Sequence, residues 1–160
     1  MRLMARTAFF TAFALLLWVG RADALIVNYV VPLSGAQEVG GGDPDGTGTA
    51  TLTLDTSLNT IAWNIVVANI AAVTMDHIHQ APAGVNGGVV IDFSGALVGS
   101  GLIDADVSAV VANPTNYYVN VHTGDFPGGA IRGQIPEPAT LTLLGAGLLG
   151  LAAASRRRVG

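Results

Sequence analysis

The chain contains three histidines, and their side-chain chemistry and positions are compatible with a metal site. His77 and His79 are two residues apart in the segment 75–84, so on a β-strand both imidazoles point to the same face. His122 lies in a second segment of strand-forming residues, 117–123. Three imidazoles form a ligand set that proteins use for zinc and copper. His77, His79 and His122 are therefore our candidate metal ligands, with copper or zinc as the candidate ion.

A structural role of the same histidines is the alternative. A histidine can tie a loop to a strand through hydrogen bonds alone, without binding an ion. The alternation of side chains fixes faces only within one strand, so the sequence does not show whether the imidazoles of the two segments meet. Asp76 and Asp125 lie near the histidines in sequence and could serve as further ligands or hold the imidazoles in place.

The segments that must position the histidines read as β-strands. Short runs of β-branched and aromatic residues alternate with turns rich in glycine, proline, asparagine and aspartate. The predicted strands are 25–31, 48–54, 60–67, 72–79, 88–93, 96–103, 117–123 and 130–135. One short helix is predicted at 104–112, because an acidic start and an alanine-rich body precede Asn113-Pro114. Many short strands with little helix predict an all-β fold, a single antiparallel β-sandwich.

The N-terminal end reads as a secretory signal peptide covering residues 1–24. Arg2 and Arg6 precede an uncharged, mostly apolar run at 7–19, and Ala22-Asp23-Ala24 has the small residues of a signal peptidase site. The folded domain is then expected at residues 25–135. A buried terminal helix is the alternative explanation of this apolar run.

The C-terminal end, residues 136–160, reads as a membrane segment. Pro136-Glu137-Pro138 ends the predicted domain, and residues 139–154 carry no charge. A helix of this length approaches the thickness of a hydrocarbon core, so we expect a transmembrane helix at 139–154 rather than a buried helix. Arg156, Arg157 and Arg158 follow it, and the positive-inside rule places them in the cytoplasm and the domain outside.

This C-terminal end resembles the PEP-CTERM sorting signal of Gram-negative bacteria. The resemblance rests on three parts in order: Pro136-Glu137-Pro138, the apolar run and the closing arginines. It implies recognition by an exosortase-type transpeptidase and cleavage near the Pro-Glu-Pro sequence. It also implies a temporary stay in the inner membrane, followed by transfer to the cell surface or the exopolysaccharide matrix, so exopolysaccharide is a further candidate partner.

The predicted domain is strongly acidic. The chain has no lysine and no cysteine, and Arg132 is the only arginine between residues 25 and 135. One positive and nine negative side chains give this part a formal charge of −8. Nucleic-acid binding is excluded, because no basic surface is present to neutralise phosphates. We expect Arg132 to pair with a nearby carboxylate such as Asp125.

The domain itself resembles the CHRD domain, a module common in exported bacterial proteins. The residues that carry this resemblance are 33–39, 77–84, 116–123 and 126–135, and it covers about residues 28–135. It implies a β-sandwich and no established reaction. The His-x-His strand is also similar to that of Cu/Zn superoxide dismutases (SODs), but the chain lacks the cysteines and the number of histidines of that family. The expected fold is therefore an Ig-like or SOD-like sandwich.

Two functions follow from these features. The first is an exported, surface- or matrix-directed protein that acts as a non-enzymatic interaction or structural module. The alternative is a metal-binding extracellular protein that uses the three histidines. No nucleophile motif accompanies the serines and aspartates, so no catalytic residue is predicted. Asp43-Pro44-Asp45-Gly46 is similar to part of a calcium loop, but the glutamate that should close such a loop is missing, and a plain turn is expected.

Overall fold

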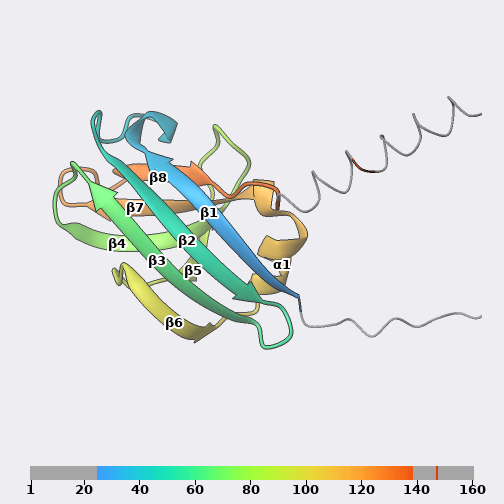
Figure 1. The fold of residues 1–160 in the computed structure, drawn as a ribbon. Helices are drawn as coiled ribbons and strands as arrows, with labels where there is room; N and C mark the ends of the chain where they lie inside the picture. Colours follow the sequence, from blue (N-terminus) through green and yellow to red (C-terminus); the bar gives the residue numbers. More distant parts are fainter. Residues whose placement is uncertain (1–24, 139–146, 148–160) are drawn as a thin grey trace, which may run out of the picture.

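The computed structural model describes residues 25–138 and residue 147. Their main feature is one antiparallel sheet of eight strands (Figure 1). The strands are β1 (Ile26–Ser34), β2 (Thr47–Asp55), β3 (Thr60–Ala68), β4 (Val73–Gln80), β5 (Gly88–Asp92), β6 (Val98–Ile103), β7 (Tyr117–Thr123) and β8 (Ile131–Gln134). The helical elements are η1 (Gly35–Gln37), α1 (Val107–Ala112) and η2 (Pro114–Asn116). Each predicted strand and the predicted helix is confirmed, with ends that differ by a few residues.

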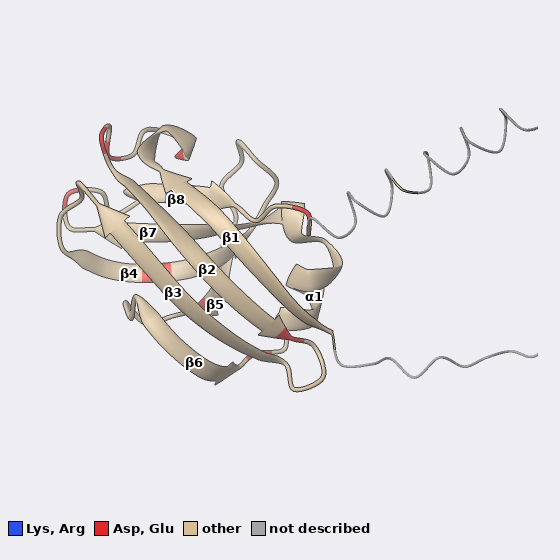
Figure 2. Cartoon of the chain, viewed as in Figure 1, with Lys and Arg blue, Asp and Glu red and all other residues tan. Residues whose placement is uncertain are grey.

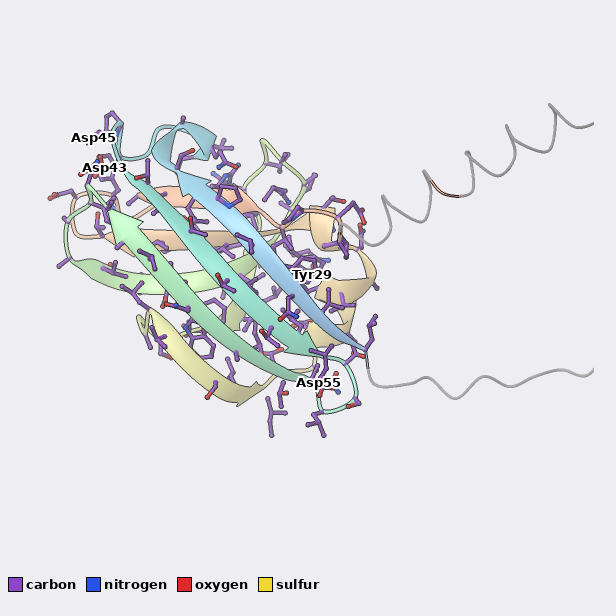
Figure 3. The ribbon with its side chains drawn as sticks, viewed as in Figure 1. Tyr29, Asp43, Asp45 and Asp55 are labelled. Carbon is purple, nitrogen blue, oxygen red and sulfur yellow. The ribbon has the colours of Figure 1, made fainter. Side chains whose placement is uncertain are left out.

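The β2–β3 hairpin shows how local chemistry sets these elements. Alternating residues of β2 are buried and exposed, which is the pattern of a strand that covers a core with one face. At its end, the Asp55 carboxylate accepts hydrogen bonds from the backbone N–H groups of Ser57 and Leu58, at 2.8 and 3.2 Å. Figure 3 shows Asp55 at this hairpin end of β2. Asn59 completes the turn with a φ of 50°, a left-handed conformation that asparagine tolerates.

The sheet curls on itself because its central link is short. The strand order is β5-β4-β7-β8-β1-β2-β3-β6. β1 and β2 pair over nine positions, whereas β1 and β8 pair at one, with Ser34 opposite Arg132. The two halves of the sheet are joined at this short link and lie at an angle to each other, so they cross with the core between them (Figure 1). The all-β prediction is confirmed, but the two layers of the predicted sandwich belong to one continuous sheet.

The core between the two halves is aliphatic and aromatic. One half contributes Leu52 and Ile61 and the other Ile78 and Val119, all of them fully buried. Where the halves meet at their edges, the rings of Trp63 and Phe93 stack with centroids 4.4 Å apart. Burial of each large aliphatic side chain stabilises a fold by about 1.5–3 kcal/mol. Because the chain has no cysteine, this packing replaces the disulfides that many exported domains use.

The acidic residues lie mainly at strand ends and in loops, as the red segments of Figure 2 show. Asp43 and Asp45 lie in the loop that leads into β2 (Figure 3). This loop is a turn, in which the Gly46 N–H donates to the Asp43 carbonyl at 3.2 Å. Its Asp43 N–H donates to the Ala130 carbonyl at 2.8 Å, which ties the loop to the start of β8.

The predicted targeting segments lie outside the described residues. These are the signal peptide at 1–24, with its cleavage site at Ala22 and Ala24, and the transmembrane helix at 139–154, of which only residue 147 is described. Among the residues that are described, no helix is both long and apolar enough to cross a membrane.

Candidate metal centre

Two neighbouring antiparallel strands, β4 and β7, carry the three histidines. Directly opposite each other in this pair are Met75 and His122, His77 and Asn120, and His79 and Tyr118. Opposed residues of an antiparallel pair share a face, so all three imidazoles lie on the same side of the sheet. The apolar residues between them, among them Ile78 and Val119, point to the other side, into the core.

The histidine face is not open to solvent. His77, His79 and His122 are only 7%, 8% and 6% exposed. Their ring centroids are 5.4 Å apart for His77 and His79, 5.2 Å for His77 and His122, and 5.9 Å for His79 and His122. One nitrogen from each ring lies within 4.8 Å of the other two. The structure therefore brings together the three histidines that the sequence singled out.

Backbone carbonyls fix the orientation of two of the rings. His79 Nδ1 lies 3.0 Å from the carbonyl oxygen of Gly87, and His122 Nδ1 lies 3.0 Å from that of Pro127. A carbonyl oxygen can only accept, so each Nδ1 carries the proton and donates it. In a neutral ring this leaves the lone pair on Nε2.

A carboxylate lies beside the third ring. His77 Nε2 lies 3.5 Å from an oxygen of Asp92, which faces it across the β4–β5 pair. A proton on Nε2 leaves the lone pair on Nδ1. Histidines that ligate metals commonly donate their other ring N–H to a carbonyl or a carboxylate, as His79 and His122 do to carbonyls here.

The remaining nitrogens are left without partners. His77 Nδ1, His79 Nε2 and His122 Nε2 are buried and accept no hydrogen bond. A buried polar atom without a partner costs about 1–3 kcal/mol. Burial is the main factor that lowers the pKa of His77 and of His79, and the neighbouring imidazoles lower both further. The two rings are therefore held in the neutral form, which is the form that binds metal ions.

The aspartates near the cluster differ from those expected from the sequence. Asp76 is fully buried on the opposite face of β4, and this burial raises its pKa, while Asp125 is exposed in the turn after β7. Asp92, which the sequence reading did not single out, is the carboxylate that contacts a histidine. Asp92 could not be identified from the sequence, because its place opposite His77 depends on the register of the β4–β5 pair.

Arg132 takes a structural role that differs from the expected pair with Asp125. Its side chain is 2% exposed and donates to the Gln37 and Val85 carbonyls and to Asn86 Oδ1, at 2.7, 3.3 and 2.9 Å. In the described part of the chain, no carboxylate lies within ion-pair distance of it. Arg132 instead holds the 81–87 loop, whose Gly87 carbonyl orients His79.

A family model described as the CHRD domain matches residues 29–135. The chain belongs to the CHRD domain family. Strands β4 and β7 lie inside the matched region, so the three-histidine cluster is part of the CHRD domain. No curated protein and no solved structure matches the chain significantly.

A second family model, the PEP-CTERM protein-sorting motif, matches residues 134–158. It begins where the match to the CHRD domain ends, and in the structure Pro136 and Glu137 are exposed directly after the buried Ile135. The motif implies export and membrane-associated processing by exosortase-type sorting machinery before release at the surface. Neither the CHRD domain nor the sorting motif is an enzymatic family.

Proposed function

We propose that this protein is a non-enzymatic metal-binding module that is sorted to the cell surface or the extracellular matrix. Its CHRD domain binds one copper or zinc ion through His77, His79 and His122. The sorting motif supplies the address, with an exosortase-type transpeptidase as the processing partner and the inner membrane as a transient anchor.

One observation carries the proposal: the three imidazoles lie together, and each has one buried nitrogen that lacks a hydrogen-bond partner. Histidines that only tie loops to strands would use the nitrogens that already bond to Gly87 and Pro127, and they would gain nothing from facing one another. Instead, each ring leaves one buried nitrogen without a partner, and the three rings lie side by side. A metal ion there would satisfy all three nitrogens at once.

The distances allow this with small movements. In a tetrahedral site with metal–nitrogen bonds of about 2.0–2.1 Å, the ligand nitrogens lie about 3.3–3.5 Å apart. The three nitrogens lie within 4.8 Å of one another, so rotations of the side chains would bring them to that spacing. The carbonyl and carboxylate contacts hold the rings close to the required orientation before the ion arrives.

The test is the metal content of the full-length chain, produced with its export signals and purified in detergent through a tag without histidine. We expect about one equivalent of copper or zinc, lost in a His77→Ala/His79→Ala variant. Asp125→Asn is the matched control for cations gathered by exposed acids, and it should keep the ion. A wild-type protein that takes up no copper or zinc, or a double variant that retains it, would overturn the proposal. Three purely structural histidines and an interaction module would then remain.

A further inference from the structure

Beside the cluster lies a further side chain that can coordinate a metal ion and that is neither one of the three histidines nor one of the nearby aspartates. Met75 precedes His77 by two residues on β4, so both point to the same face. In the β4–β7 pair it is directly opposite His122. Directly opposed residues have Cβ atoms about 4.5–5.5 Å apart. Met75 is therefore adjacent to two of the three histidines, along the strand and across it.

Met75 also lies at the accessible end of the cluster. Strand β5 covers β4 from His77 to Gln80 and does not extend to Met75, whose side chain is 44% exposed. A methionine has three rotatable side-chain bonds, so its thioether can turn toward or away from the imidazoles at little cost. An ion that approaches the buried nitrogens from this end would meet the sulfur first.

We propose that Met75 is a fourth ligand and that it makes the site selective for copper, above all for Cu(I). This inference rests on the proposed function. A thioether is a soft ligand that suits Cu(I), whereas zinc sites in proteins are built from thiolates, imidazoles and carboxylates. Three neutral imidazoles and a neutral sulfur add no negative charge, which also suits a monovalent ion better than a divalent one. The Asp92 carboxylate, which lies 3.5 Å from Nε2 of His77, would partly balance the charge of the ion.

The test compares Cu(I) and Zn(II) affinities of the full-length chain in detergent, each in competition with a chromophoric chelator. Met75→Leu keeps the apolar volume and removes the sulfur. We expect its Cu(I) affinity to fall by about tenfold or more and its Zn(II) affinity to stay within about twofold, as for a lost soft ligand. Val66→Leu, at an exposed apolar side chain of β3, is the matched control and should change neither affinity.

A direct readout separates this inference from the proposed function. The other two methionines, Met1 and Met4, lie in the predicted signal peptide, so in a chain labelled at methionine methyl groups the Met75 signal is identified as the one that disappears in Met75→Leu. We expect that signal to shift when Cu(I) is added and to stay unchanged with Zn(II). Binding that is lost in His79→Ala but equal in wild type and Met75→Leu would overturn the role of Met75 and leave the three-histidine site standing. Absence of binding to the wild type would overturn both.

Discussion

The phenol ring of Tyr118 lies nearly parallel to the imidazole of His79, with centroids 5.0 Å apart and an angle of 10° between the planes. The two residues are also joined through Gly87. Its N–H donates to the Tyr118 hydroxyl at 3.1 Å, and its carbonyl accepts from His79 Nδ1 at 3.0 Å. The Arg132 guanidinium lies 4.5 Å from the centroid of the same phenol ring, a cation–π contact. His79 is thus held by the stack against the face of its ring and by the hydrogen bond from its Nδ1.

Gly87→Ala should weaken metal binding without touching a histidine. A Cβ at this position would lie 1.9 Å from the backbone oxygen of Gln80, so the loop must move and take its carbonyl away from His79. Loss of such a supporting contact typically reduces metal affinity by about 10- to 100-fold. A Cβ added at the neighbouring Gly88 would meet no atom within 4 Å, so Gly88→Ala is the matched control. Equal copper or zinc affinities of the two variants, measured by chelator competition, would show that the carbonyl does not position His79.

Asp92→Asn tests the carboxylate beside His77. The variant keeps the shape of the side chain but removes the charge that faces His77 Nε2 at 3.5 Å. The side chain of Asp92 is 59% exposed, so water can replace part of the contact. We therefore expect metal affinity to fall by about tenfold, the low end of the range for a lost supporting contact. Thermal unfolding without metal should change little. A loss of stability with unchanged affinity would instead make Asp92 a purely structural residue.

Arg132→Gln should destabilise the fold. The variant removes donors that satisfy the Gln37 and Val85 carbonyls and ends the contact with Tyr118. Breaking buried hydrogen bonds of a charged group costs about 1.5–3 kcal/mol, which chemical denaturation of the purified chain can measure. Asp125→Asn serves as the control, because Asp125 is exposed and is not paired with Arg132. If Asp125→Asn were as destabilising as Arg132→Gln, the salt bridge expected from the sequence would exist after all.

The strands could be predicted from the sequence because each one has its own local pattern of residues. β7 was predicted with its observed bounds. The β2–β3 hairpin is predicted by the alternation of polar and apolar residues and by the turn that Asp55 begins. The closure of the sheet could not be predicted from the sequence. It depends on the single register position that joins β1 to β8, and no local pattern encodes a pairing between strands about 100 residues apart.

The site shows the same division between local and non-local information. The His-x-His spacing predicts that His77 and His79 share a face, because alternation is a property of one strand. That His122 joins them follows from the antiparallel register of β4 and β7. The roles of Asp92 and Arg132 follow from contacts with other strands and loops, so the nearest acids in sequence, Asp76 and Asp125, were misleading guides.

Glu38 should make the folded protein less stable as the pH rises toward and above neutral. One of its carboxylate oxygens is buried without a partner, and burial raises the pKa of this group to about 7, although the charge of Arg132 opposes the rise. The folded state therefore prefers the neutral acid. Its stabilising contribution is complete below the ordinary pKa of a glutamate and is lost as the pH rises through about 7.

Glu38→Gln keeps the neutral shape at every pH, so its stability relative to wild type should increase between about pH 4.5 and pH 8. Denaturant unfolding at several pH values measures the difference. Asp55→Asn is a control of opposite sign: hydrogen bonds from Ser57 lower the pKa of Asp55, so wild type should lose its advantage over that variant only as the pH falls into the acid range. A constant difference between wild type and Glu38→Gln across this range would mean that Glu38 is ionised in the folded protein. Its carboxylate would then have to be solvated or closer to Arg132 than the structure shows.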